Sequence, residues 1–177
     1  MHTPLIVVTV GTDHHPFNRL MDWLEPWLAA HPAVRCVAQH GTSRPPRGAE
    51  CHTILPHEDL LSLLAEATAV VCHGGPGTIT DARNAGLLPL VVPRNAALGE
   101  HVDNHQIRFT TLLSTQNAIL LPDSAPTLHT LLTTSLTTPH RTPPTPTDLT
   151  PTLTTFTSLI DDLLTSPRRH LPTLRRP

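Results

Sequence analysis

Short apolar runs alternate along this chain with longer stretches in which apolar residues recur every three or four positions. The runs predict strands and the longer stretches predict helices, an alternation typical of βα units and a parallel sheet. Two of the later runs lack polar alternation, as expected for central parallel strands that are covered on both faces. The predicted class is therefore α/β, a parallel sheet of about six strands with helices on both faces. The predicted strands are 5–10, 34–39, 51–55, 69–73, 88–92 and 118–121, and the predicted helices are 17–30, 58–67, 78–85 and 103–113.

The composition changes near Pro122, after which Thr, Leu and Pro dominate. We therefore predict a domain over residues 1–122 and a Thr/Pro-rich tail over residues 123–177. Apolar residues at helical spacing predict one helix in the tail, and a second apolar stripe follows a Pro-rich linker at 139–151. Two interpretations of that stripe stay open: a last core helix of this domain, or a segment that docks on a partner. The first helix carries Leu128, Leu131, Leu132 and Leu136, and the stripe carries Leu153, Phe156, Leu159, Ile160, Leu163 and Leu164.

The charge and the length limit the possible functions. A chain of 177 residues has room for one domain with an appendage. Its 12 cationic side chains face 14 carboxylates, so the net charge of -2 gives no general attraction for nucleic acid. Three cysteines, an odd count without paired metal-ligand spacing, favour reduced thiols over a disulfide framework. We expect a cytoplasmic protein that does not bind nucleic acid.

The strongest local motif is a glycine-rich turn between a buried predicted strand and a predicted helix, with the sequence His-Gly-Gly-Pro-Gly-Thr at residues 73–78. Small residues let a ligand approach the backbone, and the free amides at a helix N-terminus attract anions. The turn therefore predicts a diphosphate site. A tight strand-to-helix turn without a ligand is the simpler alternative.

Three further segments are expected at the same carboxyl edge of the sheet, where open α/β folds bind ligands. They contain Gly11 and Thr12, then Gln39 and Gly41, then the polar string 99–106. Carboxylates and amides of that string can hydrogen-bond the neighbouring hydroxyls of a sugar, although they can also cap a helix or face solvent. A carboxylate on the first turn of the helix after the glycine-rich turn can bind both ribose hydroxyls or simply stabilise the helix N-terminus. The sugar candidates are Glu100, Asp103, Asn104 and Gln106, and the ribose candidate is Asp81.

Residues 69–106, together with the segments around residues 11 and 39, resemble the C-terminal, nucleotide-sugar-binding half of family 28 glycosyltransferases of the GT-B fold. The similarity is greater still to the stand-alone catalytic subunits of split N-acetylglucosaminyl and exopolysaccharide glycosyltransferases. The resemblance covers roughly residues 5–121, and the tail matches nothing specific. It implies one Rossmann-like half of a GT-B fold.

The resemblance also assigns residue roles. The UDP phosphates would bind the glycine-rich turn, the ribose would bind Asp81, the uracil would lie near Gln39, Gly41 and Leu55, and the donor sugar would contact the string before the last predicted helix of the domain. Asp81 stands where many relatives have Glu, so its reach is one methylene shorter. The donor-binding set is Gly11, Thr12, Gln39, Gly41, Leu55, His73, Gly74, Gly75, Gly77, Thr78, Asp81, Glu100, Asp103, Asn104 and Gln106.

The implied activity is transfer of a sugar from UDP, with inversion, to a lipid-linked acceptor. A membrane-anchored partner subunit would bind the acceptor and supply the catalytic base, so no catalytic residue is assigned here. Location at the inner face of the membrane through that partner is an open alternative to a purely cytoplasmic one. A non-catalytic nucleotide-sugar-binding module or sensor is the competing function. No cofactor is expected, and no metal, because His101 and His105 have helical spacing but no third ligand is identifiable.

Overall fold

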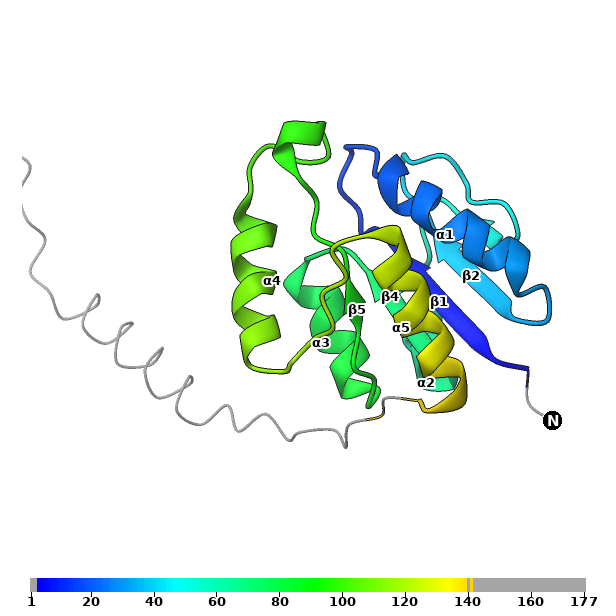
Figure 1. The fold of residues 1–177 in the computed structure, drawn as a ribbon. Coiled ribbons are helices and arrows are strands. Elements are labelled where there is room, and N and C mark those ends of the chain that lie inside the picture. Colours follow the sequence, from blue (N-terminus) through cyan, green and yellow to red (C-terminus); the bar gives the residue numbers. More distant parts are fainter. Residues whose placement is uncertain (1–2, 140, 142–177) are drawn as a thin grey trace, which may run out of the picture. The chain divides into compact units, whose positions relative to one another are not determined.

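The computed structural model describes residues 3–139 and 141. They form a parallel five-stranded sheet in the order β3-β2-β1-β4-β5, with helices on both faces (Figure 1). The predicted α/β class is confirmed. The strands are β1 (Leu5–Thr9), β2 (Arg35–Gln39), β3 (Glu50–His52), β4 (Ala69–Cys72) and β5 (Leu90–Val91), and the helices are α1 (Asn18–Ala30), α2 (His57–Glu66), α3 (Pro76–Asn84), the short 3-10 turn η1 (Ala96–Leu98), α4 (His105–Thr115) and α5 (Ala125–Thr137).

Strand β1 shows why the central runs are continuously apolar. All five of its residues are buried, and alternate side chains enter different cores. Ile6 and Val8 pack with α1 and α5 on one face, whereas Leu5 and Val7 pack with α2 and α3 on the other. Because both faces are covered, neither has room for polar alternation.

The predicted sixth strand is reduced to a single bridge. Leu120 pairs with Leu90 in parallel, through hydrogen bonds from Val91 N to Leu120 O (2.7 Å) and from Leu120 N to Pro89 O (2.9 Å). The ladder cannot lengthen, because Pro89 and Pro122 have no amide hydrogen to donate.

The compact unit continues beyond the predicted boundary at residue 122. Helix α5 packs beside α1 (Figure 1). Its Leu128 and Leu132 are fully buried in the same core as β1. Trp27 Nε1 in α1 also donates to Thr133 Oγ1 in α5 (3.0 Å). The apolar spacing correctly predicted this helix, but the Thr/Pro composition around it suggested a tail. Apart from residues 139 and 141, the linker 139–151 lies outside the described residues, as does the second apolar stripe, 153–164.

Within the described residues, no helix is both long and apolar enough to cross a membrane. The three cysteines are free thiols, as predicted. Burial raises the pKa of both Cys36 and Cys72 to about 12, so these two thiols stay protonated at neutral pH.

Candidate functional site

The carboxyl ends of β1, β2 and β4 open into a pocket of about 450 Å³. This volume lies within the usual range for ligand sites, and the position is where open parallel sheets bind ligands. Nine predicted donor-binding residues line the pocket: Gly11, Thr12, Gln39, Leu55, His73, Gly75, Gly77, Thr78 and Asp81. The other lining residues are Thr9, His57, Leu60 and Pro76.

The imidazole of His73 lies between two glycines that cannot carry a side chain. A Cβ on Gly11 would stand 2.5 Å from His73 Cε1, and a Cβ on Gly75 would stand 2.2 Å from His73 Nε2. Gly11 also has a positive φ of +73°, which glycine adopts without strain. The glycines at these two positions therefore make room for the histidine.

His73 is held in its neutral form. Burial lowers its pKa to about 4, and the nearby positive charge of Arg94 acts in the same direction. Its Nδ1 has no hydrogen-bond partner among the described residues. A neutral imidazole with an unpaired nitrogen therefore lies in the wall of the pocket.

Helix α3 directs its N-terminus at the pocket. Gly75 is its N-cap and Pro76 its first residue, and the N-cap makes no side-chain hydrogen bond to the first turn. A Cβ built on Gly77 meets no described atom within 4 Å, so this position faces open space. The amides of the first turn and the helix dipole form a setting for a negatively charged ligand.

Gln39 was predicted to lie beside a base, and the structure shows what its amide does within the chain. Its Nε2 donates to Gly11 O (3.1 Å), and its Oε1 accepts from Leu55 N (3.1 Å). The buried side chain thus ties the loop after β1 to the loop after β3. Gly41 lies outside the pocket lining. It has a φ of +58° and donates from its amide to Thr53 O (3.0 Å).

Asp81 reaches the pocket wall from α3. Its Oδ2 lies 3.0 Å from His57 Nε2, at the start of α2. About a quarter of the Asp81 side chain is exposed, so its carboxylate remains accessible to a ligand. Sequence reasoning missed His57, which only the packing of α2 against α3 brings to this wall.

None of the four predicted sugar-binding residues lines the pocket, and two of them, Glu100 and Gln106, are buried. Glu100 accepts two hydrogen bonds from Arg19, at 2.9 and 2.8 Å, and one from Asn95 N. Gln106 Oε1 accepts from Gly74 N (3.0 Å) and Arg94 N (3.2 Å). Gln106 therefore fixes the glycine-rich turn from behind, while Gly74 faces Gln106 and not the pocket.

The two other predicted sugar-binding residues, Asp103 and Asn104, are exposed. Asn104 Oδ1 accepts from Ala96 N (2.9 Å). Asp103 Oδ1 accepts from His105 N (2.9 Å) and lies 2.5 Å from His105 Nδ1. These hydrogen bonds shape the loop before α4, and the sugar contact assigned to the string stays a prediction.

Arg94 is the main residue of this edge that sequence reasoning missed. It is fully buried. Its guanidinium donates to Val10 O (2.8 Å), His15 O (2.7 Å) and Glu100 O (3.0 Å), and so joins three loops. Burial lowers its pKa, against the attraction of Asp13 and Glu100. A single arginine after an apolar strand gave no local signal of this role.

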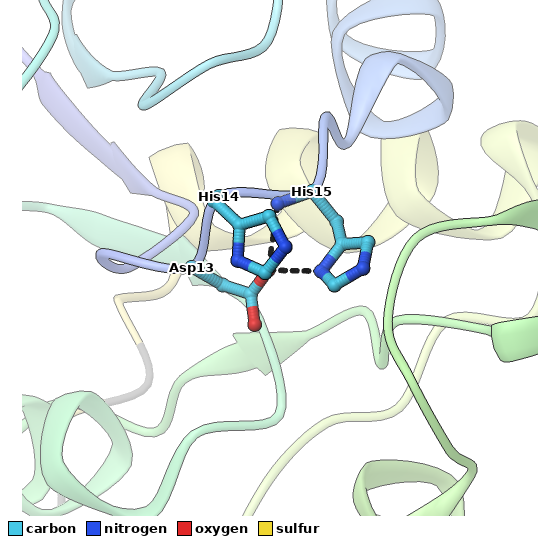
Figure 2. Close-up of side chains that lie close together, drawn as sticks. All are labelled: Asp13, His14 and His15. Carbon is cyan, nitrogen blue, oxygen red and sulfur yellow. Dashed lines mark hydrogen bonds and ion pairs between the residues drawn. The ribbon is translucent and has the colours of Figure 1, made fainter.

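A second polar cluster follows β1. Figure 2 shows Asp13, His14 and His15 side by side, with Asp13 bonded to both the backbone and the ring of His15. Asp13 also meets His101 Nε2 at 3.3 Å. Burial opposes ionisation of Asp13, but the hydrogen bonds from His15 and the charge of Arg94 outweigh it and lower the pKa of the carboxyl.

The sequence over residues 5–145 matches the model of the glycosyltransferase family 28 C-terminal domain. The chain therefore belongs to this family, and its fold is that of one half of a GT-B enzyme. No curated protein matched the chain.

Several solved glycosyltransferase structures resemble the chain. The spinosyn forosaminyltransferase SpnP gives a TM-score of 0.58 at 19% identity, over 88% of this chain and 44% of that one. MurG from Acinetobacter baumannii gives a TM-score of 0.54 at 21% identity, over 77% of this chain and 42% of MurG. The glycotransferase of kitacinnamycin gives a TM-score of 0.53 at 19% identity, over 77% of this chain and 35% of that one. At these identities the likeness shows the fold, and the chain spans less than half of each structure.

Proposed function

We propose that this domain binds a UDP-sugar in the pocket at the carboxyl edge and serves as the donor-binding part of a glycosyltransferase. The observation that supports this most is the convergence on one pocket of an anion-attracting helix N-terminus, an accessible carboxylate and the backbone beside Leu55. These are the chemical groups needed for the diphosphate, the ribose and the base.

In the proposed complex, the diphosphate accepts hydrogen bonds from the first-turn amides of α3, near Gly77 and Thr78. Asp81 accepts from the ribose hydroxyls, displacing or sharing its contact with His57. The uracil lies beside Gln39 and the backbone near Leu55, which hold each other in place at this end of the pocket.

The proposed transfer inverts the anomeric carbon. The acceptor hydroxyl attacks that carbon from the face opposite the UDP and loses its proton to a base, while the bond to the diphosphate oxygen breaks. The amides of α3 stabilise the negative charge that UDP gains as it leaves. This step requires no metal ion from the domain.

The proposed acceptor is lipid-linked and is bound by a membrane-anchored partner subunit, which also supplies the base. This chain spans 35 to 44% of the three structures described above, and the proposal assigns the acceptor-binding part to the partner. A domain of this kind binds its donor alone and transfers sugar only when the acceptor-binding part is present.

Calorimetric titration of the full chain with UDP, ADP, GDP and CDP tests the donor class. We expect UDP to bind most tightly, and equal or absent binding of all four would contradict the proposal. Incubation with the candidate partner subunit, a UDP-sugar and a lipid-linked acceptor then separates a transferase from a non-catalytic binding module, because only the transferase releases UDP from the UDP-sugar as the acceptor is glycosylated.

A substitution at Asp81 tests the ribose contact. Asp81→Asn keeps the shape but removes the charge that attracts two hydroxyls, so UDP binding should weaken and the preference for UDP over 2′-deoxy-UDP should shrink. Asp59→Asn, on the exposed first turn of α2, is the matched control and should change neither. An unchanged preference in Asp81→Asn would remove the ribose assignment.

A further inference from the structure

Outside the pocket, six metal-ligating side chains form a continuous cluster on two loops. The loop after β1 contributes Asp13, His14 and His15, and the segment before α4 together with its first residue contributes His101, Asp103 and His105. Within each group of three, the possible ligand atoms lie within 4.8 Å of one another. The 3.3 Å contact between Asp13 Oδ2 and His101 Nε2 joins the two groups.

The distances around Asp13 suit a shared ion. Asp13 Oδ1 lies 2.6 Å from His15 Nδ1 and 4.0 Å from His14 Nδ1. Two ligands of a tetrahedral ion with bonds of about 2.0 to 2.1 Å stand roughly 3.3 Å apart. Small side-chain shifts of His14 and His15 toward this separation would place three ligand atoms around one centre (Figure 2).

Hydrogen bonding alone does not account for the whole cluster. The contact from Asp13 to His14 is too long for a hydrogen bond. The exposed ring of His14 nevertheless lies beside the ring of His15, with centroids 4.0 Å apart and planes tilted by 39°. His15 and His101 are largely buried, so two of the imidazoles and the Asp13 carboxylate are already ordered by the fold. Preordered ligands lower the cost of binding an ion.

We propose that Asp13, His14 and His15 bind one divalent transition-metal ion of the Zn²⁺ type, with water as the fourth ligand. Imidazole nitrogen combined with carboxylate oxygen suits Zn²⁺, Ni²⁺, Cu²⁺ or Co²⁺, whereas Mg²⁺ and Ca²⁺ select all-oxygen sites. The ion would order the loop after β1, and the contact of Asp13 Oδ2 with His101 Nε2 ties that loop to the segment that precedes α4. Its role is independent of the nucleotide bound in the pocket.

Titration of the full chain with Zn²⁺ after removal of metals by a chelator tests this proposal. We expect one equivalent to bind and to raise the melting temperature, with Mg²⁺ doing neither. With Co²⁺ in place of Zn²⁺, we expect visible absorption bands of a four-coordinate site. Absence of binding, or binding without a defined stoichiometry, would overturn the site.

Variants distinguish this site from nonspecific binding of Zn²⁺ by other histidines, of which the chain has 13 in all. Asp13→Asn and the exposed His14→Gln should each weaken Zn²⁺ binding by about tenfold or more, because each removes a ligand. His14→Gln lies on the surface, so the test does not depend on the stability of the Asp13 variant. His52→Gln, which removes another histidine paired with a carboxylate (Nε2 to Glu50 Oε1, 3.1 Å), is the matched control. Equal affinity in all four proteins, the parent and the three variants, would contradict the proposal.

Discussion

The glycine-rich turn after β4 and the polar string before α4 lie at the same edge of the sheet, but they use their polar groups differently. The turn leaves the first amides of α3 open toward the pocket and carries His73 with an unpaired Nδ1. In the string, Glu100 and Gln106 are buried and their side-chain acceptors are engaged within the chain. The turn leaves polar groups of its backbone unpaired among the residues that the structure describes, and the string holds the turn in place. A dense run of polar residues is therefore no measure of ligand contact by itself.

The largest expected effect comes from Arg94→Ala, which removes the buried guanidinium that joins the loops behind both segments. Three carbonyl groups lose their donor, and we expect the free energy of unfolding to fall by about 3 kcal/mol or more. Urea denaturation measures this fall in the free energy of unfolding. Arg35→Ala is the control, because it breaks a half-exposed pair with Glu50 and should cost less than about 1 kcal/mol. Similar losses in the two variants would show that Arg94 does not organise this edge.

His73 gives the glycine-rich turn a pH dependence. Its pKa is about 4 in the folded protein against about 6.5 when unfolded, so the unfolded chain binds a proton that the folded chain excludes. Stability at this site is therefore complete above about pH 6.5, falls as the pH drops toward 4, and loses up to about 3 kcal/mol in total. Between about pH 4 and 7.5, the free energy of unfolding should change less with pH in His73→Asn than in the parent. The same pH dependence in both proteins would contradict the burial of a neutral imidazole.

Gln106→Ala tests whether the string supports the turn from behind. It leaves the amides of Gly74 and Arg94 without their acceptor, so we expect a loss of about 2 kcal/mol in stability together with similar weakening of UDP and UDP-sugar binding. Asp103 is exposed, so Asp103→Ala should leave the free energy of unfolding nearly unchanged. If the string does touch the sugar, Asp103→Ala will weaken UDP-sugar binding and spare UDP. A Gln106 variant that loses UDP-sugar alone would make this residue a ligand contact.

Two glycines of the same turn should respond differently to substitution, and one of them gives the smallest expected change in stability. Gly75→Ala collides with His73 and should cost about 1 to 3 kcal/mol. Gly77→Ala meets only open space and should be neutral or stabilising by up to about 1 kcal/mol, since alanine favours helix. Its methyl group nevertheless stands where the diphosphate is proposed to approach, so UDP affinity should fall by about tenfold, or 1.4 kcal/mol. Normal UDP affinity in a stable Gly77→Ala protein would move the phosphate away from this amide.

Local pattern was enough to predict most of the framework. Apolar runs identified β1 and β4, and helical spacing identified α1 and α5, because periodicity is a property of neighbouring positions. The glycine-rich turn was predicted between strand and helix for the same reason, and nine predicted donor-binding residues meet in one pocket. Composition was less reliable: the Thr/Pro bias placed α5 in a tail, whereas its leucines complete the core.

Only the tertiary structure decided which polar groups line the pocket and which bond within the protein. Arg94 bonds to a carbonyl 84 residues away, Gln106 to an amide 32 residues away, and Asp13 to His101 across two loops. These pairs arise because the parallel order β3-β2-β1-β4-β5 gathers the ends of distant strands at one edge. The amino-acid sequence by itself determined the elements and the turn, through short-range propensity and hydrophobic period. The partners of the buried polar side chains depend on burial and distance, which exist only once the sheet has assembled.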